Sequence, residues 1–260
     1  MSDAAGSRPE PYVKHGGPST PPEYFPIEAA GLRWLAAAPD GAAVVGVQEV
    51  GSHHIVLDRL KTARPTTEAA ESFGAALART HAAGAPAFGS PPEGWEGDGF
   101  IGRQRMAMRP TPTWGAFYAE QRVLPYAREA YDIHHLSAAG LAAVERVAER
   151  LRAGELDDGR PPARIHGDLW SGNVVFTPAG VVVIDPAAHG GHGLTDLAML
   201  HLFGAPGLER ISDTYAEAAG LHDGWRDLVG LHQLHPLLVH AVSHGPAYGS
   251  EAAGVARRYR

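Results

Sequence analysis

The sequence contains no cysteine. This absence excludes disulfide bridges, thiolate nucleophiles, iron–sulfur clusters and cysteine-built zinc sites, and it leaves the redox compartment weakly constrained. No apolar run approaches the ~20 residues that a membrane-spanning helix needs. The chain also does not open with a basic segment followed by an apolar stretch, which argues against a secretory signal. We therefore expect a soluble, cytoplasmic protein with no membrane partner.

An excess of positive charge is also missing. The 260 residues include 22 Lys and Arg against 29 Asp and Glu, a formal net charge of −7. This balance argues against a surface for nucleic acid. The length fits one large domain or two modest lobes, and it is sufficient for a sizeable core.

Strand signals dominate the beginning of the chain and helix signals the rest. A helix is expected at 25–38, and strands at 11–14, 42–50 and 53–58, the last two joined by a turn at Gly51 and Ser52. After a linker at 61–65, helices are expected at 66–84, 113–130, 137–153 and beyond 194. Residues 85–112 are expected to form a long Gly- and Pro-rich loop. The pattern predicts an α+β fold with a small β-rich lobe (residues 1–60) and a large, mostly helical lobe (residues 61–260).

A polar loop lies between β-prone segments in "RIHGDLWSGNVVF" (164–176). The turn signal "TPAG" (177–180) then separates "NVVF" from "VVVID", which predicts a hairpin. In that hairpin Asn173 and Asp185 would lie roughly opposite each other, with Cβ atoms about 4.5–5.5 Å apart. Two oxygen-bearing side chains suit Mg²⁺ that keeps waters and takes further ligands from phosphate.

Asp168 lies in the same loop, five residues before Asn173. It could reach the reacting group while Asn173 and Asp185 hold the metal. The arrangement His166-x-Asp168-x₄-Asn173, followed by Asp185, matches the catalytic loop of protein kinases. Taken singly, each Asp or Asn could simply cap a turn in a polar loop. The four residues together, at this spacing, favour phosphoryl transfer instead.

The segments "HGDLWSGNVVF" and "VVVIDPAAHGGHGLTDLAMLHLFG" resemble the fructosamine kinase (ketosamine kinase) family. These enzymes belong to the aminoglycoside-phosphotransferase-like group and have a protein-kinase-like fold. The resemblance extends from about residue 11 to the C-terminus. The octet "HGDLWSGN" is specific, since the wider group carries His-Gly-Asp and Asn but not usually this Trp-Ser-Gly.

The resemblance implies roles for the residues that would act on the substrate hydroxyl, the metal ion and the ATP phosphates. Asp168 is the implied catalytic aspartate, which accepts the proton of the substrate hydroxyl, and Asn173 and Asp185 are the implied ligands of Mg²⁺. Lys14 would contact the ATP phosphates, and Glu28 would hold Lys14. Lys14 could instead be a surface lysine, and Glu28 could favour a helix N-terminus, but their order on a strand and then a helix fits the kinase pair.

The resemblance also implies residues around the nucleotide and the substrate. Asp58, Arg59 and Leu60 would form the hinge that contacts adenine through its backbone. Trp170 would line the sugar site, and His166 and Asp196 would contact substrate or support the catalytic loop.

The implied activity is an ATP- and Mg²⁺-dependent phosphorylation of a ketosamine. The acceptor would be the C3 hydroxyl of a sugar joined to a small amine or to a protein lysine, and the labile product would shed the sugar, which amounts to deglycation. Two alternatives stay open. One is a phosphotransferase for an aminoglycoside or another amino-alcohol, and the other is a nucleotide-binding pseudokinase without catalysis.

One family element has no counterpart in the sequence. The hairpin that covers the phosphates needs roughly 20 residues, whereas ten precede Pro11 and none of them forms Gly-x-Gly-x-x-Gly. A misplaced start codon, a natural truncation and a pseudoenzyme are three competing explanations. For the chain as given, with an N-terminally truncated small lobe, we expect weak ATP binding and slow turnover. The exposed sheet edge could pair with another chain, although the oligomeric state stays open.

The 15 histidines raise the question of a metal site. His240 and His244 are four residues apart on an expected helix, a spacing that can bind zinc, but no Glu follows the first. Packing or contact with a polar substrate is favoured.

Overall fold

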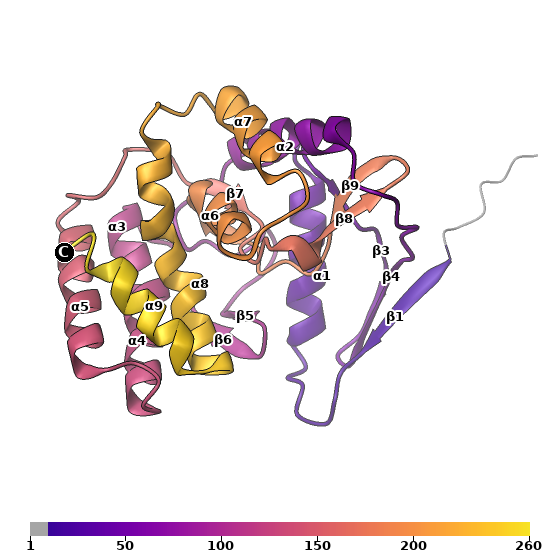
Figure 1. Ribbon diagram of the computed structural model, residues 1–260. Coiled ribbons are helices and arrows are strands. Elements are labelled where there is room, and N and C mark those ends of the chain that lie inside the picture. Colours follow the sequence, from indigo (N-terminus) through magenta and orange to yellow (C-terminus); the bar gives the residue numbers. More distant parts are fainter. Residues whose placement is uncertain (1–9) are drawn as a thin grey trace, which may run out of the picture.

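The computed structural model describes residues 10–260, and its first elements build a small antiparallel sheet (Figure 1). The sheet has the order β1-β4-β3, formed by β1 (Pro11–His15), β4 (His54–Asp58) and β3 (Val47–Val50). Helix α1 (Tyr24–Ala36) buries Phe25 and Leu32 against this sheet. The strand predicted at 11–14 and the helix predicted at 25–38 are confirmed. The question of a covering hairpin concerns residues 1–9, which lie outside the described residues.

The stretch 42–50, predicted as one strand, divides into two. Its first part, β2 (Ala43–Val44), pairs in parallel with β9 (Gly180–Val183), whereas β3 pairs with β4. The change of partner occurs beside Gly46, where an added Cβ would collide with the carboxylate of Asp58. The β3–β4 connection spans residues 51–53 instead of the predicted two-residue turn, and Gly51 N–H donates to His54 O at 2.9 Å.

Helices dominate after residue 66, as predicted. Their bounds are α2 (Thr67–Ala82), α5 (Ala138–Arg152), α6 (Leu194–Phe203), α7 (Leu208–Ala219), η3 (Trp225–Leu228), α8 (Val229–His244) and α9 (Pro246–Ala256). Thr66 caps α2, because its side chain accepts a hydrogen bond from Ala69 N–H. One apolar cluster lies among α2, α6 and α7, and another among α5, α8 and α9 (Figure 1). Within residues 10–260, no helix is both long and apolar enough to cross a membrane.

The helix predicted at 113–130 is interrupted. It starts as α3 (Trp114–Phe117), widens into the π-helical turn η1 (Tyr118–Val123) and continues as α4 (Leu124–Asp132). Pro125 lacks an N–H, and in a regular helix its ring would clash with the carbonyl of Gln121, four residues earlier. In the wider turn, this carbonyl accepts a hydrogen bond from Arg122 Nη1 at 3.0 Å.

The loop predicted at 85–112 contains a hairpin that the sequence did not predict. Strands β5 (Gly99–Ile101) and β6 (Gln104–Met106) pair antiparallel across a turn at Gly102 and Arg103. Gly102 has a φ of +55°, in the left-handed region that favours glycine. The hairpin lies beside α1, since the ring centroids of Phe100 and Tyr24 are 5.3 Å apart.

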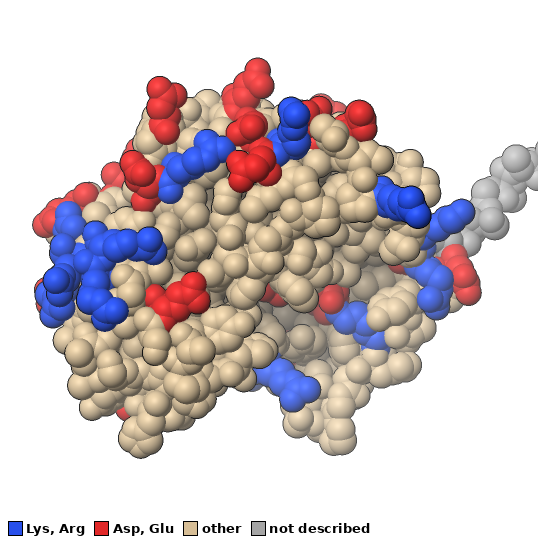
Figure 2. Space-filling model, viewed as in Figure 1, with Lys and Arg blue, Asp and Glu red and all other residues tan. Residues whose placement is uncertain are grey.

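Two further ladders position the polar segments. Strand β7 (Ala163–Ile165) pairs antiparallel with β10 (His189–Gly191), and β8 (Val174–Thr177) forms the predicted hairpin with β9. Residues 166–173, which end in the short helix η2 (Ser171–Asn173), connect β7 to β8, and residues 184–188 connect β9 to β10. The two connections therefore run between the same pair of ladders. Figure 2 shows a hollow in the surface between the α1 side and the α8–α9 side of the molecule.

Candidate active site

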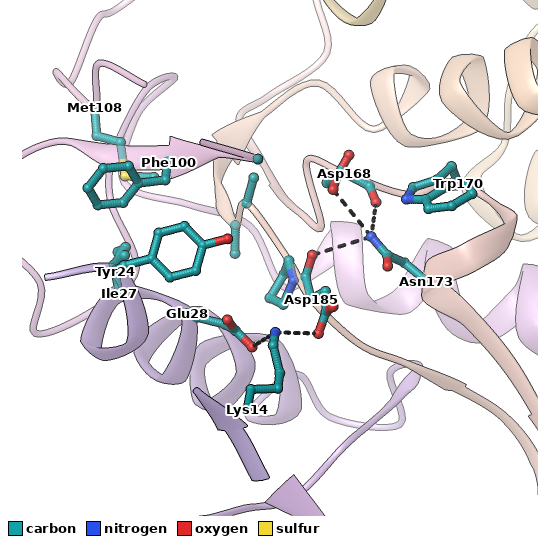
Figure 3. Close-up of a pocket in the computed structure, with 14 residues that line it drawn as sticks. Lys14, Tyr24, Ile27, Glu28, Phe100, Met108, Asp168, Trp170, Asn173 and Asp185 are labelled. Carbon is teal, nitrogen blue, oxygen red and sulfur yellow. Dashed lines mark hydrogen bonds and ion pairs between the residues drawn. The ribbon is translucent and has the colours of Figure 1, made fainter. Parts of the chain in front are cut away.

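Asp168, Asn173 and the backbone of Asp185 meet in one hydrogen-bonded cluster (Figure 3). The side-chain nitrogen of Asn173 donates to Asp168 O at 2.8 Å, to Asp168 Oδ2 at 3.3 Å and to Asp185 O at 3.4 Å. Because this nitrogen is occupied, Asn173 Oδ1 is left as the atom that can bind a ligand.

The hairpin pairs around the turn at 177–180 that the sequence predicted, and its register fixes where Asn173 and Asp185 lie. Val174 pairs with Val183, and Ile184 N–H donates to Asn173 O at 3.1 Å. Asn173 therefore lies opposite Ile184, so Asp185 is one position away from the rough opposition to Asn173 that the sequence predicted. The reason is that the pairing centre lies between Pro178 and Ala179, so Asp185 is the first residue beyond the paired segment. Its φ of +53° is uncommon for a residue with a side chain and marks local strain.

Lys14 connects the first sheet, α1 and the Asp185 segment. Its ammonium group lies 2.8 Å from Glu28 Oε1 and 3.0 Å from Asp185 Oδ1 (Figure 3). Burial alone would lower the pKa of Lys14, but the two carboxylates outweigh it and raise this pKa above its ordinary value. The structure thus places Lys14 and Glu28 together, as the strand-then-helix order predicted, and Lys14 is held as a cation.

The fully buried carboxylate of Asp196, in the first turn of α6, holds the start of the polar loop. It accepts hydrogen bonds from His166 N–H and Gly167 N–H, both at 2.8 Å. His81 lies 3.0 Å from the same carboxylate and 2.7 Å from the hydroxyl of Tyr215. Burial alone would raise the pKa of Asp196, but His81 and the backbone donors lower it below its ordinary value. No motif or spacing in the sequence pointed to His81 or Tyr215.

His166 lies behind the loop. Burial lowers its pKa below the ordinary value, which favours the neutral imidazole. Its Nε2–H donates to Ile184 O at 2.8 Å, and its Nδ1 accepts from Asp168 N–H at 3.2 Å. His166 therefore joins the Asp168 loop to the end of the hairpin.

The side chain of Asp168 is the titrating group at the centre of the site. Burial, together with the negative charges of Asp185 and Asp196, raises its pKa to about 6, although the hydrogen bond from Asn173 opposes the shift. A carboxylate with this pKa is mostly ionised at neutral pH, yet it is basic enough to accept a proton.

Two adjoining cavities share Asp168 and Trp170. The first, of about 250 Å³, lies between α1, the β5–β6 hairpin and the polar loops, and six predicted site residues line it: Lys14, Glu28, Asp168, Trp170, Asn173 and Asp185. The second, of about 400 Å³, extends toward α8 and α9. Trp170 is 41% exposed between them. It folds over Gly172, where an added Cβ would collide with the indole ring.

The predicted hinge residues line a separate cavity of about 300 Å³. Asp58, Arg59 and Leu60 form one of its sides, Val45, Leu57, Val175 and Ile184 supply apolar surface, and Lys14 and Asp185 connect it to the first cavity. Arg59 N–H donates to Glu10 O at 2.8 Å, whereas Leu60 N–H has no hydrogen-bond partner among residues 10–260.

His240 and His244 do not form a metal site with other described residues, since no group of three or more His, Asp or Glu side chains in residues 10–260 could hold an ion. Their rings stack with centroids 4.9 Å apart, and His240 Nδ1 lies 2.7 Å from Pro236 O. Both residues line the second cavity.

Comparisons with known proteins agree with this geometry. The fructosamine kinase family model matches residues 9–259. A solved structure from Thermobifida fusca, assigned as a fructosamine-3-kinase, is 45% identical, with a TM-score of 0.88 over 96% of this chain and 85% of its own. A relative from Thermus thermophilus, named a probable ketoamine kinase, is 32% identical over 88% of this chain and 79% of its own length. An ADP-bound aminoglycoside phosphotransferase, 14% identical with a TM-score of 0.60 over 96% of this chain and 88% of its own, shares the fold. The predicted kinase-like fold is confirmed.

Proposed function

This chain belongs to the fructosamine kinase family, and on that premise we propose that it transfers the γ-phosphoryl group of ATP to the C3 hydroxyl of a ketosamine. The observation that carries the proposal is the single cavity that gathers Lys14, Asp168, Asn173 and Asp185. The phosphorylated product would be labile and release its sugar, so the reaction would remove glycation from an amine.

The nucleotide would enter through the hinge cavity. Its apolar residues suit a flat base, and Leu60 N–H and Asp58 O are backbone groups that could pair with the adenine edge. Lys14 would meet the phosphates, since it lines both this cavity and the one that contains Asp168. We propose that residues 1–60 form the nucleotide lobe and residues 61–260 the catalytic lobe.

The residues present fit a magnesium ion. Asn173 Oδ1 and the Asp185 oxygen that does not contact Lys14 are hard oxygen donors, and their small number suits a metal that keeps waters and binds phosphate. We propose these two residues as its ligands. When bound, Mg²⁺ would neutralise charge on the phosphate oxygens.

Asp168 would act on the acceptor. Its raised pKa lets the carboxylate accept the hydroxyl proton as the bond to phosphorus forms. Asn173 holds the Asp168 backbone and side chain, and Asp196 holds the two residues before Asp168. The catalytic carboxylate is thereby fixed before substrate binds, which is the main contribution that a protein makes to phosphoryl transfer.

The charge of the second cavity favours a ketosamine over an aminoglycoside. An aminoglycoside is a polycation and needs several carboxylates around it. In the part of the chain that the structure describes, Asp168 is the single Asp or Glu that lines this cavity, and Arg103 adds a positive charge. A ketosamine carries one amine and several hydroxyls, which neutral and aromatic side chains can contact.

A substrate panel tests the proposal. The wild-type protein is assayed with ATP, Mg²⁺ and a ketosamine, an aminoglycoside or choline, with the phosphorylated product detected by mass spectrometry. We expect phosphorylation of the ketosamine alone. Turnover of only another acceptor would replace the proposed substrate. ATP binding without any product would instead support a pseudokinase.

A further inference from the structure

The turn of the β5–β6 hairpin lies where three cavities meet. Gly102 lines both cavities that contain Asp168, and Arg103 lines the second of them. Arg103 also lines a third cavity, of about 490 Å³, bounded by the segment between β1 and α1. A side chain at this turn therefore lies beside any ligand that extends from Asp168 toward the opening of the cleft.

Arg103 is a cation without a protein partner among the described residues. It is exposed, and no hydrogen bond, ion pair or ring contact within residues 10–260 involves it. The next arginine in the hairpin differs, because Arg105 lies over the ring of Phe100 at 5.3 Å. Lys14 is the other Lys or Arg lining the third cavity, and Glu28 and Asp185 already neutralise it.

The surroundings of Arg103 are poor in negative charge, although the whole chain carries a net charge of −7. Among residues 10–260, no Asp or Glu lines the third cavity, and Asp168 is the one carboxylate that lines the second. The guanidinium group therefore sets a local positive potential at the outer part of the acceptor cavity.

Much of the remaining wall of the second cavity is apolar or aromatic, and its other polar groups come from Gln104, Ser243 and the two histidines described above. Trp170, Phe203 and Tyr248 contribute rings, and Met199 and Val239 contribute aliphatic surface. Its volume of about 400 Å³ falls in the range of small-molecule sites. A ligand held there with its hydroxyl at Asp168 would extend its far end toward Arg103.

We propose that Arg103 selects ketosamines that carry an anionic group at the end remote from the reacting hydroxyl. This inference rests on the proposed function and defines its substrate class. The anion is either a carboxylate of the amine component or a phosphate at the distal end of the sugar. Both match the planar donor fork of a guanidinium group, which binds carboxylate and phosphate with two parallel hydrogen bonds.

Three synthetic substrates separate the two sources. The first joins fructose to glycine and carries a carboxylate, the second joins it to glycinamide and is uncharged at that end, and the third is the 6-phosphate of the second. The values of kcat/KM are compared for the wild type, R103M and R103K. R128M is the matched control, because Arg128 is an exposed arginine on α4 that lines none of these cavities.

We expect the wild type to prefer one anionic compound over the glycinamide compound roughly tenfold, mainly through KM. R103M should lose this preference but keep the activity on the glycinamide compound. R103K should keep part of the preference, and R128M should behave as the wild type. Equal kcat/KM of the wild type for all three compounds would overturn the inference about Arg103 but not the proposed function. So would an R103M variant that loses activity equally on all three compounds. No turnover of any of them would refute the proposed function as well.

Discussion

At the scale of single residues, the raised pKa of Asp168 predicts the pH dependence of turnover. The group must be ionised to accept a proton, so kcat/KM should fall about tenfold per pH unit once the pH drops below about 6. A pH–rate profile with wild-type protein measures this limb. A flat profile down to pH 4.5, in a protein that stays folded, would contradict the role of Asp168.

The same pKa predicts a conflict between stability and catalysis. An unfolded aspartate titrates near 3.9, whereas Asp168 in the fold titrates at about 6. Its ionisation therefore destabilises the fold, fully above pH 6 and not at all below about pH 4. D168N should melt at a higher temperature than the wild type at pH 7.5, and the difference should vanish at acidic pH. D132N, at an exposed site on α4, should show no such gain.

The Lys14–Glu28 pair gives a second prediction at this scale. K14M leaves Glu28, which is 7% exposed, without its cation and should lower the free energy of unfolding by about 1–3 kcal/mol. Adding E28Q should recover part of this loss, because the neutral side chain no longer needs the ammonium group. Chemical denaturation of the single and double variants measures the effect. A further loss in the double variant would contradict the pairing.

Some of these residues could be predicted from the sequence and others could not. Lys14, Glu28 and the Asp168–Asn173 spacing are local or follow from the order of elements. His81 and Tyr215 are different, since they lie 115 and 134 positions from their partners Asp196 and His81. Such contacts depend on how α2, α6 and α7 pack, and a residue pattern along the chain does not encode that packing.

At the scale of elements, the polar loop depends on a glycine conformation. Gly167 has a φ of +80°, and an added Cβ would collide with Ala187 O. G167A should therefore destabilise the fold by about 1–3 kcal/mol and lower turnover at least tenfold, since Asp168 follows directly.

Gly154 supplies the matched control for this substitution. It has a φ of +74° but open space around its Cβ position. G154A should therefore lower the free energy of unfolding by about 1 kcal/mol or less, through backbone strain without a steric collision, and should keep wild-type turnover. Thermal melting and steady-state kinetics of both variants make the comparison. If G167A and G154A changed turnover equally, the loop that carries Asp168 would tolerate the displacement caused by the added Cβ at position 167, which would contradict this prediction.

Short and irregular elements were the ones that the sequence did not predict. The strands of the β5–β6 hairpin have three residues each, too few for an alternating pattern to separate from a loop. The π-helical turn is a response of the backbone to Pro125, which predicts a bend but not its form. The long amphipathic helices and the β8–β9 hairpin carried enough periodic residues to be predicted.

At the scale of the whole molecule, nucleotide should join the sheet of β1, β3 and β4 to the catalytic loops. Lys14 and Asp185 line both the hinge cavity and the first catalytic cavity, so one ligand would contact both parts of the chain. ATP with Mg²⁺ at 100 times its Kd should stabilise the fold by about 2.7 kcal/mol. Chelation of Mg²⁺ should abolish turnover and reduce this stabilisation, which thermal melting with and without chelator measures. An unchanged melting temperature with ATP and Mg²⁺ at saturating concentration would contradict the nucleotide site.

Transfer of labelled γ-phosphoryl from ATP to a ketosamine, by the wild type and D168N side by side, is the most direct measurement of the central claim. The account predicts transfer by the wild type and a loss of about 10²–10⁴-fold in D168N, with nearly equal affinity of both proteins for ATP and Mg²⁺. Equal transfer rates in the two proteins would contradict it.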